Sequence, residues 1–199
     1  MQLVLVRHAL PIRIDATADG GAADPELADR GWEQARRVVE ALSGDQVDAI
    51  YASPALRAQQ TAAPLASALG LDVSTEPGLA EFDAGHSTYV PVEELKAEGG
   101  ARWEALRTGK LPGVDHVAFR AAVVAGVERI VAAHPGGRAV LFAHSGTINA
   151  WTGHVAGVTR PLWVAPDYAS LTRVGAARDG RRGLVSLNET GHVRDLLSG

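Results

Sequence analysis

The chain has 199 residues, enough for one ordinary domain with a substantial core, and we predict a single domain over residues 1–199. Its net charge of −4 speaks against a nucleic-acid binder, so any attraction for an anionic substrate must be local. Because there is no cysteine, disulfides, thiol catalysis and thiolate-bound metals are excluded. The opening apolar run is too short to cross a bilayer, and we expect no signal peptide, no membrane association and a cytoplasmic location.

The first stretch with chemical character is a short apolar run that ends in a charged pair. Residues 3–6 (Leu-Val-Leu-Val) have the composition of a buried strand, and Arg7 and His8 follow at its end. Pro11 stops further ladder pairing. Since open α/β sheets bind ligands at the carboxyl ends of their strands, we interpret His8 as a nucleophile and Arg7 as part of an anion cradle.

A loop, a helix and a second strand are predicted next. The polar stretch from Ile12 to Asp24 is typical of a loop lying over the end of the first strand. The pattern that starts at Leu27 indicates a helix through about Leu42, and residues 48–52 (Asp-Ala-Ile-Tyr-Ala) indicate a short strand.

A second helix follows this strand. Ser53 is expected to be its N-cap and Pro54 its first helical residue, which places Arg57 in the first turn. A cation is unfavourable there unless it faces a bound anion, so Arg57 is either an ordinary surface residue or an anion ligand. Pro64 is expected to kink or split this helix, and Gly70 to close it.

The second half of the chain continues the alternation of strands and helices. The loop after the next strand holds two carboxylates, Glu81 and Asp83. The expected elements are a strand over 71–75, an interrupted helix over 92–107 with a break at Gly99-Gly100, a helix over 115–133, a strand over 138–142, a helix from about Thr147 to Val155, and a hairpin of strands 169–174 and 183–187.

A second histidine also follows an apolar strand. His144 comes directly after residues 138–143, and the helix that follows offers backbone N–H groups to an anion. His8 and His144 would meet if their two strands are neighbours in one parallel sheet. The seven histidines include no H-x-x-x-H pair and no H-E-x-x-H motif, so we expect no metal and no cofactor.

Phosphoryl transfer suits these residue types. Arginine supplies planar, bidentate donors to a phosphate ester, and neutral imidazole is a competent nucleophile. Two cations nearby favour that neutral form. The leaving alcohol then needs a proton, for which Glu81 and Asp83 are the candidates.

Four motifs together carry a resemblance to a known family. They are Arg7-His8-Ala9, Ser53-Pro54-x-x-Arg57-Ala58-x-Gln60-Thr61-Ala62, Leu79-x-Glu81-x-x-x-Gly85 and Ala143-His144-Ser145-Gly146. In this order they resemble the histidine phosphatase superfamily, also called phosphoglycerate mutase-like, and within it the small phosphatase branch. The resemblance implies an α/β fold, a three-layer α/β/α sandwich with a mostly parallel central sheet, and chemistry that needs no metal.

The resemblance also implies a role for each matching residue. His8 matches the phosphorylated nucleophile, and Glu81 matches the proton donor, with Asp83 as a backup acid. The residues implied to hold the phosphoryl group are Arg7, Arg57, His144 and, through its backbone N–H, Ser145.

The chain departs from the family pattern just after His8. Ala9, Pro11 and Ile14 replace the usual glycine, threonine and asparagine. Ile14 cannot make the asparagine's phosphate contact. Arg13, next to it, is either a substitute ligand or a loop residue that faces solvent.

Three functions follow, in order of preference. The first is a phosphomonoesterase acting on a small-molecule phosphate ester through His8 and Glu81. The second is a phosphoglycerate mutase, disfavoured because the segment from Glu81 to Asp115 is short and has only two lysines. The third is a non-catalytic phosphoryl-binding module, against which the complete residue set argues.

The substrate is left open among sugar phosphates, phosphoglycerate-type acids, a nucleoside-like phosphate and phosphohistidine proteins. A homodimer is also left open, and the composition suggests a bacterial source with GC-rich DNA. The residues that could line the entrance are Trp32, His86, Tyr89, Arg102 and Trp103.

Overall fold

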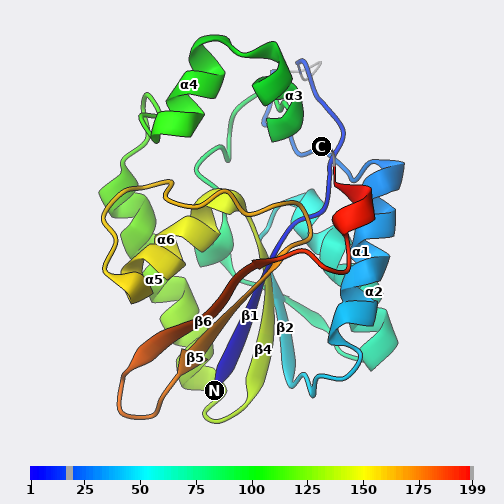
Figure 1. Ribbon diagram of the computed structural model, residues 1–199, viewed down its shortest axis with the longest axis vertical. Helices are drawn as coiled ribbons and strands as arrows, with labels where there is room; N and C mark the ends of the chain where they lie inside the picture. The colour runs from blue at the N-terminus through cyan, green and yellow to red at the C-terminus, as the bar shows by residue number, and fades with distance from the viewer. Residues whose placement is uncertain (17–19, 198–199) are drawn as a thin grey trace.

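A mixed six-stranded sheet lies between two layers of helices in the computed structural model, which describes residues 1–16 and 20–197 (Figure 1). This confirms the predicted three-layer α/β/α architecture. Residues 17–19 of the predicted loop lie outside the described residues. The elements are β1 (Gln2–Arg7), α1 (Asp29–Leu42), β2 (Ala49–Ala52), α2 (Leu56–Leu69), β3 (Val73–Thr75), α3 (Val92–Glu98), α4 (Gly100–Thr108), α5 (His116–Ala133), β4 (Arg138–Ala143), α6 (Ser145–Ala156), β5 (Leu171–Ala176) and β6 (Arg182–Glu189), with short 3-10 helices at Pro77–Leu79 and Arg194–Leu196.

The sheet topology brings the two histidine-bearing strands together. The strand order is β3-β2-β4-β1-β5-β6; the first four strands are parallel, and β5 and β6 run antiparallel as the predicted hairpin. Within the β1–β4 pair, Arg7 lies opposite Ala143. His8 and His144 therefore leave the sheet at the same edge, one residue beyond their strands.

Alternating side chains of β1 fill both layers of the core. Val4 and Val6 pack in the cluster that includes α1 and α2, whereas Leu3 and Leu5 pack in the cluster with α5 and α6. All four side chains are fully buried. Because both faces are covered, the apolar run is continuous rather than alternating, and its end is held rigidly.

The start of α2 differs from the prediction. The helix begins at Leu56, with Ala55 at the N-cap position, so the expected capping by Ser53 and the helical start at Pro54 are both wrong. Asp24 supplies the missing acceptor, since its Oδ1 accepts the Leu56 N–H at 2.8 Å. The Ser53 hydroxyl accepts the Ala55 N–H at 3.3 Å just before the helix, and it also contacts His144, as described below.

Pro64 was predicted to kink or split α2, and the split is wrong. One helix runs from Leu56 to Leu69 with Pro64 inside it. Thr61, Ala62, Leu65 and Ala66 on both sides of the proline are buried. Burial of this face outweighs the one hydrogen bond that the proline cannot donate.

The helices α3 and α4 form a cap above the carboxyl ends of the strands (Figure 1). As predicted, the two are separated at Gly99 and Gly100, whose φ angles of 68° and 81° suit glycine. The cap therefore lies over the edge from which His8 and His144 emerge.

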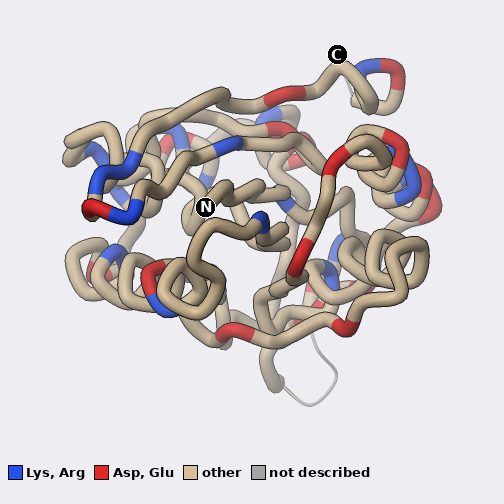
Figure 2. The backbone as a smooth tube through the Cα atoms, turned by 90° about the horizontal axis from the view of Figure 1, so that it is seen from below, with Lys and Arg blue, Asp and Glu red and all other residues tan. Residues whose placement is uncertain are grey.

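Charged residues are distributed without a dominant sign. In Figure 2, acidic and basic positions are mixed along the chain in the view from below. Among the described residues, no helix is both long and apolar enough to cross a membrane.

Candidate active site

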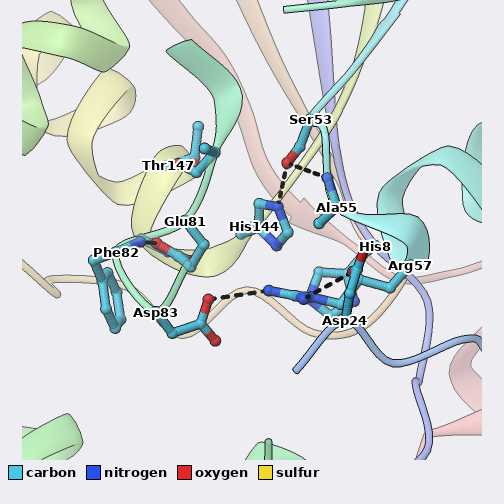
Figure 3. Close-up of polar contacts among 12 residues, drawn as sticks. His8, Asp24, Ser53, Ala55, Arg57, Glu81, Phe82, Asp83, His144 and Thr147 are labelled. Carbon is cyan, nitrogen blue, oxygen red and sulfur yellow. Dashed lines mark hydrogen bonds and ion pairs between the residues drawn. The ribbon is translucent and has the colours of Figure 1, made fainter. Parts of the chain in front are cut away.

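His8 and His144 lie side by side at the carboxyl edge of the sheet (Figure 3). Their ring centroids are 5.0 Å apart in an edge-to-face arrangement. Both side chains are almost fully buried, with exposed fractions of 3% and 1%. The structure thus brings together the two histidines that lie far apart in the sequence.

The hydrogen bond of His8 fixes which ring nitrogen is free. Its Nδ1 lies 2.8 Å from the carbonyl oxygen of Ala9, which only accepts, so Nδ1 carries the proton. Burial, followed by the charges of Arg57, His144 and Arg7, holds the His8 pKa well below its usual value of 6.5. The ring is therefore neutral at pH 7, and Nε2 keeps a lone pair for attack on an electrophile.

Arg7 is held by a tyrosine and a backbone carbonyl. Its guanidinium stacks on the Tyr168 ring, 3.8 Å from the ring centroid, and Nη1 donates to the Pro166 carbonyl at 2.7 Å. The Nε of Arg7 is buried without a protein partner. Tyr168 also lies against His8, at a centroid distance of 5.6 Å.

Arg57 has a similar environment on the opposite side of His8. Its guanidinium lies 4.8 Å from the Tyr89 ring centroid, and Nη2 donates to Asp83 Oδ1 at 3.1 Å. Only 4% of the side chain is exposed, and its Nε has no protein partner. Of the two interpretations of Arg57, the surface residue is therefore wrong.

His144 is oriented by Ser53. Its Nε2 lies 2.7 Å from the Ser53 hydroxyl, whereas Nδ1 is buried without a protein partner. Burial and the charges of Arg57 and Arg7 hold the His144 pKa well below 6.5, so this ring is also neutral. A Ser53 hydroxyl that donates to Nε2 leaves the ring proton on Nδ1.

Glu81 comes from the loop after β3, and its carboxylate lies beside the backbone of Phe82 (Figure 3). One carboxylate oxygen accepts the Phe82 N–H at 3.0 Å and the other accepts the Gly146 N–H at 2.7 Å. Burial and the like charge of Asp83 outweigh these bonds and raise the Glu81 pKa to about 8. At neutral pH this carboxyl group holds a proton that it can donate.

Gly146 permits the close approach of Glu81. A Cβ at this position would collide with the Glu81 carboxylate and the Phe82 ring. We expect Gly146→Ala to lower the free energy of unfolding by about 1–3 kcal/mol, although helix propensity alone favours alanine. Activity should fall at least about tenfold because the carboxyl group is displaced.

Thermal unfolding and steady-state rates check this expectation. The matched control is Gly191→Ala, since a Cβ at Gly191 meets no atom within 4 Å. A Gly146→Ala variant as stable and as active as this control would contradict the packing argument.

Asp83, the backup acid, lies between Arg57 and Glu81 and raises the Glu81 pKa. We expect kcat/KM to fall as the pH rises above about 8, because Glu81 then loses its proton. Asp83→Asn removes the like charge, so the fall should begin at lower pH. A pH–rate profile of wild type and of Asp83→Asn measures this. If the alkaline decline began at the same pH in both, the charge of Asp83 would not raise the Glu81 pKa.

Arg13 is not brought to this cluster. Its guanidinium is partly exposed and pairs with Asp15 at 2.5 Å, Glu94 at 3.1 Å and Glu98 at 2.5 Å. Three carboxylates hold it against the cap, and it does not line the cavity described below. The substitute-ligand interpretation is therefore not supported. Ile14 pairs through its backbone with Tyr89.

A cavity of about 650 Å³ extends from the histidines to the cap. Ser145, the first residue of α6, lines it together with the five residues His8, Arg7, Arg57, Glu81 and His144. Of the predicted entrance residues, His86, Tyr89, Arg102 and Trp103 line the cavity. Trp32 does not; it lies in α1 and packs against the core.

The cluster suits an anion rather than a cation. Two guanidinium groups and the neutral imidazole of His144 surround the His8 ring at the inner end of the cavity, and such N–H donors bind phosphoryl oxygens. Among residues 1–16 and 20–197, no group of three or more histidine or carboxylate side chains is placed to hold a metal ion.

Sequence reasoning missed three supporting residues. Tyr168 supports Arg7, Ser53 orients His144, and Gly146 admits Glu81. Ser53 and Gly146 belong to the motifs that resemble the family, and this membership could have indicated a role at the site. Tyr168 had no such signal, because only the antiparallel return of the chain into β5 brings it beside β1.

The comparison with known proteins agrees with this geometry. The model of the histidine phosphatase superfamily (branch 1) matches residues 3–190. The chain belongs to this superfamily. Phosphatase activity is thereby supported, together with the phosphoglycerate mutase-like fold.

Individual relatives in the superfamily carry phosphatase and mutase names. Phosphoserine phosphatase 1 of Hydrogenobacter thermophilus is 37% identical over 95 residues, or 48% of this chain and 45% of that protein. The match thus spans about half of that relative. Phosphoglycerate mutase-like protein 4 of Arabidopsis thaliana is 31% identical over 74% of this chain and 68% of that protein.

A solved structure matches nearly the whole histidine phosphatase domain. The mycobacterial glucosyl-3-phosphoglycerate phosphatase in complex with inorganic phosphate superposes with a TM-score of 0.75 at 25% identity. The match covers 96% of this chain and 99% of that one.

Proposed function

We propose that this chain is a phosphomonoesterase that acts through a phosphohistidine on His8. The observation that carries the proposal is the convergence of two guanidinium groups, those of Arg7 and Arg57, with His8 on the wall of one cavity. His144 and Glu81 line the same cavity, so cationic donors, a nucleophile and a proton donor surround one space. A phosphoryl dianion offers both the oxygens and the negative charge.

In the first step, Nε2 of His8 attacks the phosphorus of the ester. The P–N bond forms as the P–O bond to the leaving alcohol breaks, and Glu81 gives its proton to that oxygen. Arg7, Arg57 and His144 stabilise the charge on the equatorial oxygens. The neutral state of His8 and the raised Glu81 pKa support this division of roles.

In the second step, water releases the phosphoryl group. The ionised Glu81 accepts a proton from the water as its oxygen attacks phosphorus, and the P–N bond breaks. Inorganic phosphate leaves, and His8 returns to its neutral form with the proton still on Nδ1. A pKa near 8 allows one carboxyl group to act first as acid and then as base.

Hydrolysis and mutase activity share the first step and differ in the acceptor. The segment between Glu81 and Asp115 contains only the two cap helices and the loops that connect them to the rest of the chain. The lysines in this segment are Lys96 and Lys110, few for a site that must hold a second carboxylate acceptor. These features support water as the acceptor.

Trapping with a radiolabelled phosphate monoester tests the proposal, with the reaction quenched in alkaline detergent because a P–N bond hydrolyses in acid. We expect an acid-labile, base-stable phosphoprotein in wild type and none in His8→Ala. With 3-phosphoglycerate as substrate, inorganic phosphate should exceed 2-phosphoglycerate. Absence of any phosphoprotein and of turnover would overturn the phosphatase, and an excess of 2-phosphoglycerate would establish a mutase.

A further inference from the structure

The cavity is much larger than its phosphoryl end requires. Its volume of about 650 Å³ lies in the range of about 300–1,000 Å³ that holds drug-sized ligands. A phosphoryl group on a three-carbon alcohol fills only the part around His8. The remaining space is lined by residues of the cap helices α3 and α4, and the chemistry of this lining indicates the kind of leaving group that fits.

Much of the wall beyond the phosphoryl end is apolar. Trp103 and Leu106 contribute from α4, and Leu162 and Trp163 from the segment after α6. The indole N–H of Trp163 already donates to the Asn149 carbonyl at 3.3 Å, so the ring offers apolar surface to a ligand.

Two cations without partners lie at the solvent end of this cavity. Lys96 on α3 and Arg102 on α4 are exposed lining residues, and neither side chain has an ion pair or hydrogen bond with any described residue. Other cations in the lining are engaged, since Arg107 pairs with Glu104 at 2.7 Å. These two cations therefore add unpaired positive charge to the cavity lining outside the cluster around His8.

We propose that the preferred substrate is a phosphate monoester of a bulky alcohol with an aromatic or extended apolar body and a carboxylate at its far end. The proposal rests on the phosphatase activity proposed above. The aromatic body packs between the apolar side chains of α4 and of the segment after α6. The carboxylate reaches Lys96 and Arg102. Phosphoserine, whose body is short and polar, leaves both regions unfilled.

Three primary-alkyl esters with similar leaving groups separate these contributions: n-propyl phosphate, 3-phenylpropyl phosphate, and the latter with a para-carboxylate. Adding the phenyl ring should raise kcat/KM at least about tenfold, since burying an aromatic ring contributes about 1.5–3 kcal/mol. Adding the carboxylate should raise kcat/KM about two- to fivefold further at low salt, because a partly exposed ion pair typically contributes an effect of this size.

Variants assign each effect to its residues. Trp103→Ala should reduce the ratio of kcat/KM for 3-phenylpropyl phosphate to kcat/KM for n-propyl phosphate at least about threefold. Lys96→Gln with Arg102→Gln should abolish the carboxylate advantage alone. The matched control is Lys110→Gln, a cap cation that does not line the cavity, which should change neither.

The outcomes distinguish this inference from the function on which it rests. Equal kcat/KM for n-propyl and 3-phenylpropyl phosphate, or a faster reaction with phosphoserine, would overturn the substrate class while leaving the phosphatase intact. A carboxylate advantage that survives the double substitution would overturn the role of Lys96 and Arg102. Failure to hydrolyse any of the esters would overturn the phosphatase itself.

Discussion

Replacing His8 by alanine should reduce phosphate ester hydrolysis by at least about 10⁴-fold, because the covalent step then has no nucleophile. The remaining groups can still bind the phosphoryl oxygens, so inorganic phosphate should continue to bind. Steady-state rates measure the loss, and trapping with an alkaline quench checks that the phosphoprotein has disappeared. Residual turnover within tenfold of wild type would show that His8 is not the nucleophile.

The matched control is His154→Ala. His154 is exposed near the end of α6 and does not line the His8 cavity, so this variant should keep wild-type activity. A loss of activity in both variants would point to damaged folding rather than to missing chemistry.

The His8→Ala substitution should also change how the free energy of unfolding depends on pH. The His8 pKa is lowered in the folded protein, so below about pH 6.5 the unfolded chain binds a proton that the folded chain does not. This contribution to stability is present above pH 6.5 and is lost as the pH falls. His8→Ala should therefore show a smaller loss of stability between pH 7 and 5 than wild type, measured by urea unfolding.

The strands that carry the site were predictable because their signal is local. A continuous apolar run followed by Arg7-His8, and another followed by His144, define strand ends without any knowledge of the partner strand. The break of the cap at Gly99-Gly100 is equally local, since positive φ angles follow from the residue type.

The parts that sequence did not predict depend on contacts between distant segments. Ser53 has the local features of an N-cap, but its hydroxyl lies on His144, 91 residues away. Arg13 follows the family motif closely in the chain, yet carboxylates of α3, 81 and 85 residues away, hold it outside the cavity. Tertiary electrostatics thus override local expectation at both positions.

Supporting interactions of the two arginines were also invisible in the sequence. Arg7 and Arg57 each lie over a tyrosine ring, Tyr168 and Tyr89. No spacing relates these four residues. Stacking orients a guanidinium without using its hydrogen-bond donors, and both guanidinium groups line the cavity.

Replacing Glu81 by glutamine should lower the turnover of alkyl phosphates by about 10²–10⁴-fold, because the leaving alkoxide then receives no proton. Aryl esters such as p-nitrophenyl phosphate leave without protonation and should lose much less in the first step. Comparing kcat/KM for the two ester classes isolates the acid role. An equal loss for both would assign Glu81 to binding or structure instead.

The Glu81→Gln variant also changes how stability depends on pH. The Glu81 pKa is raised from 4.5 to about 8 in the folded protein, so its contribution is fully present below pH 4.5 and is lost as the pH rises through 8. The glutamine amide turns one N–H toward the Phe82 or Gly146 N–H, which lowers stability about equally at every pH. The slope is therefore diagnostic: between pH 5 and 9 the free energy of unfolding should fall less in the variant than in wild type. Equal slopes would mean that this carboxyl group is already ionised at neutral pH and cannot be the acid.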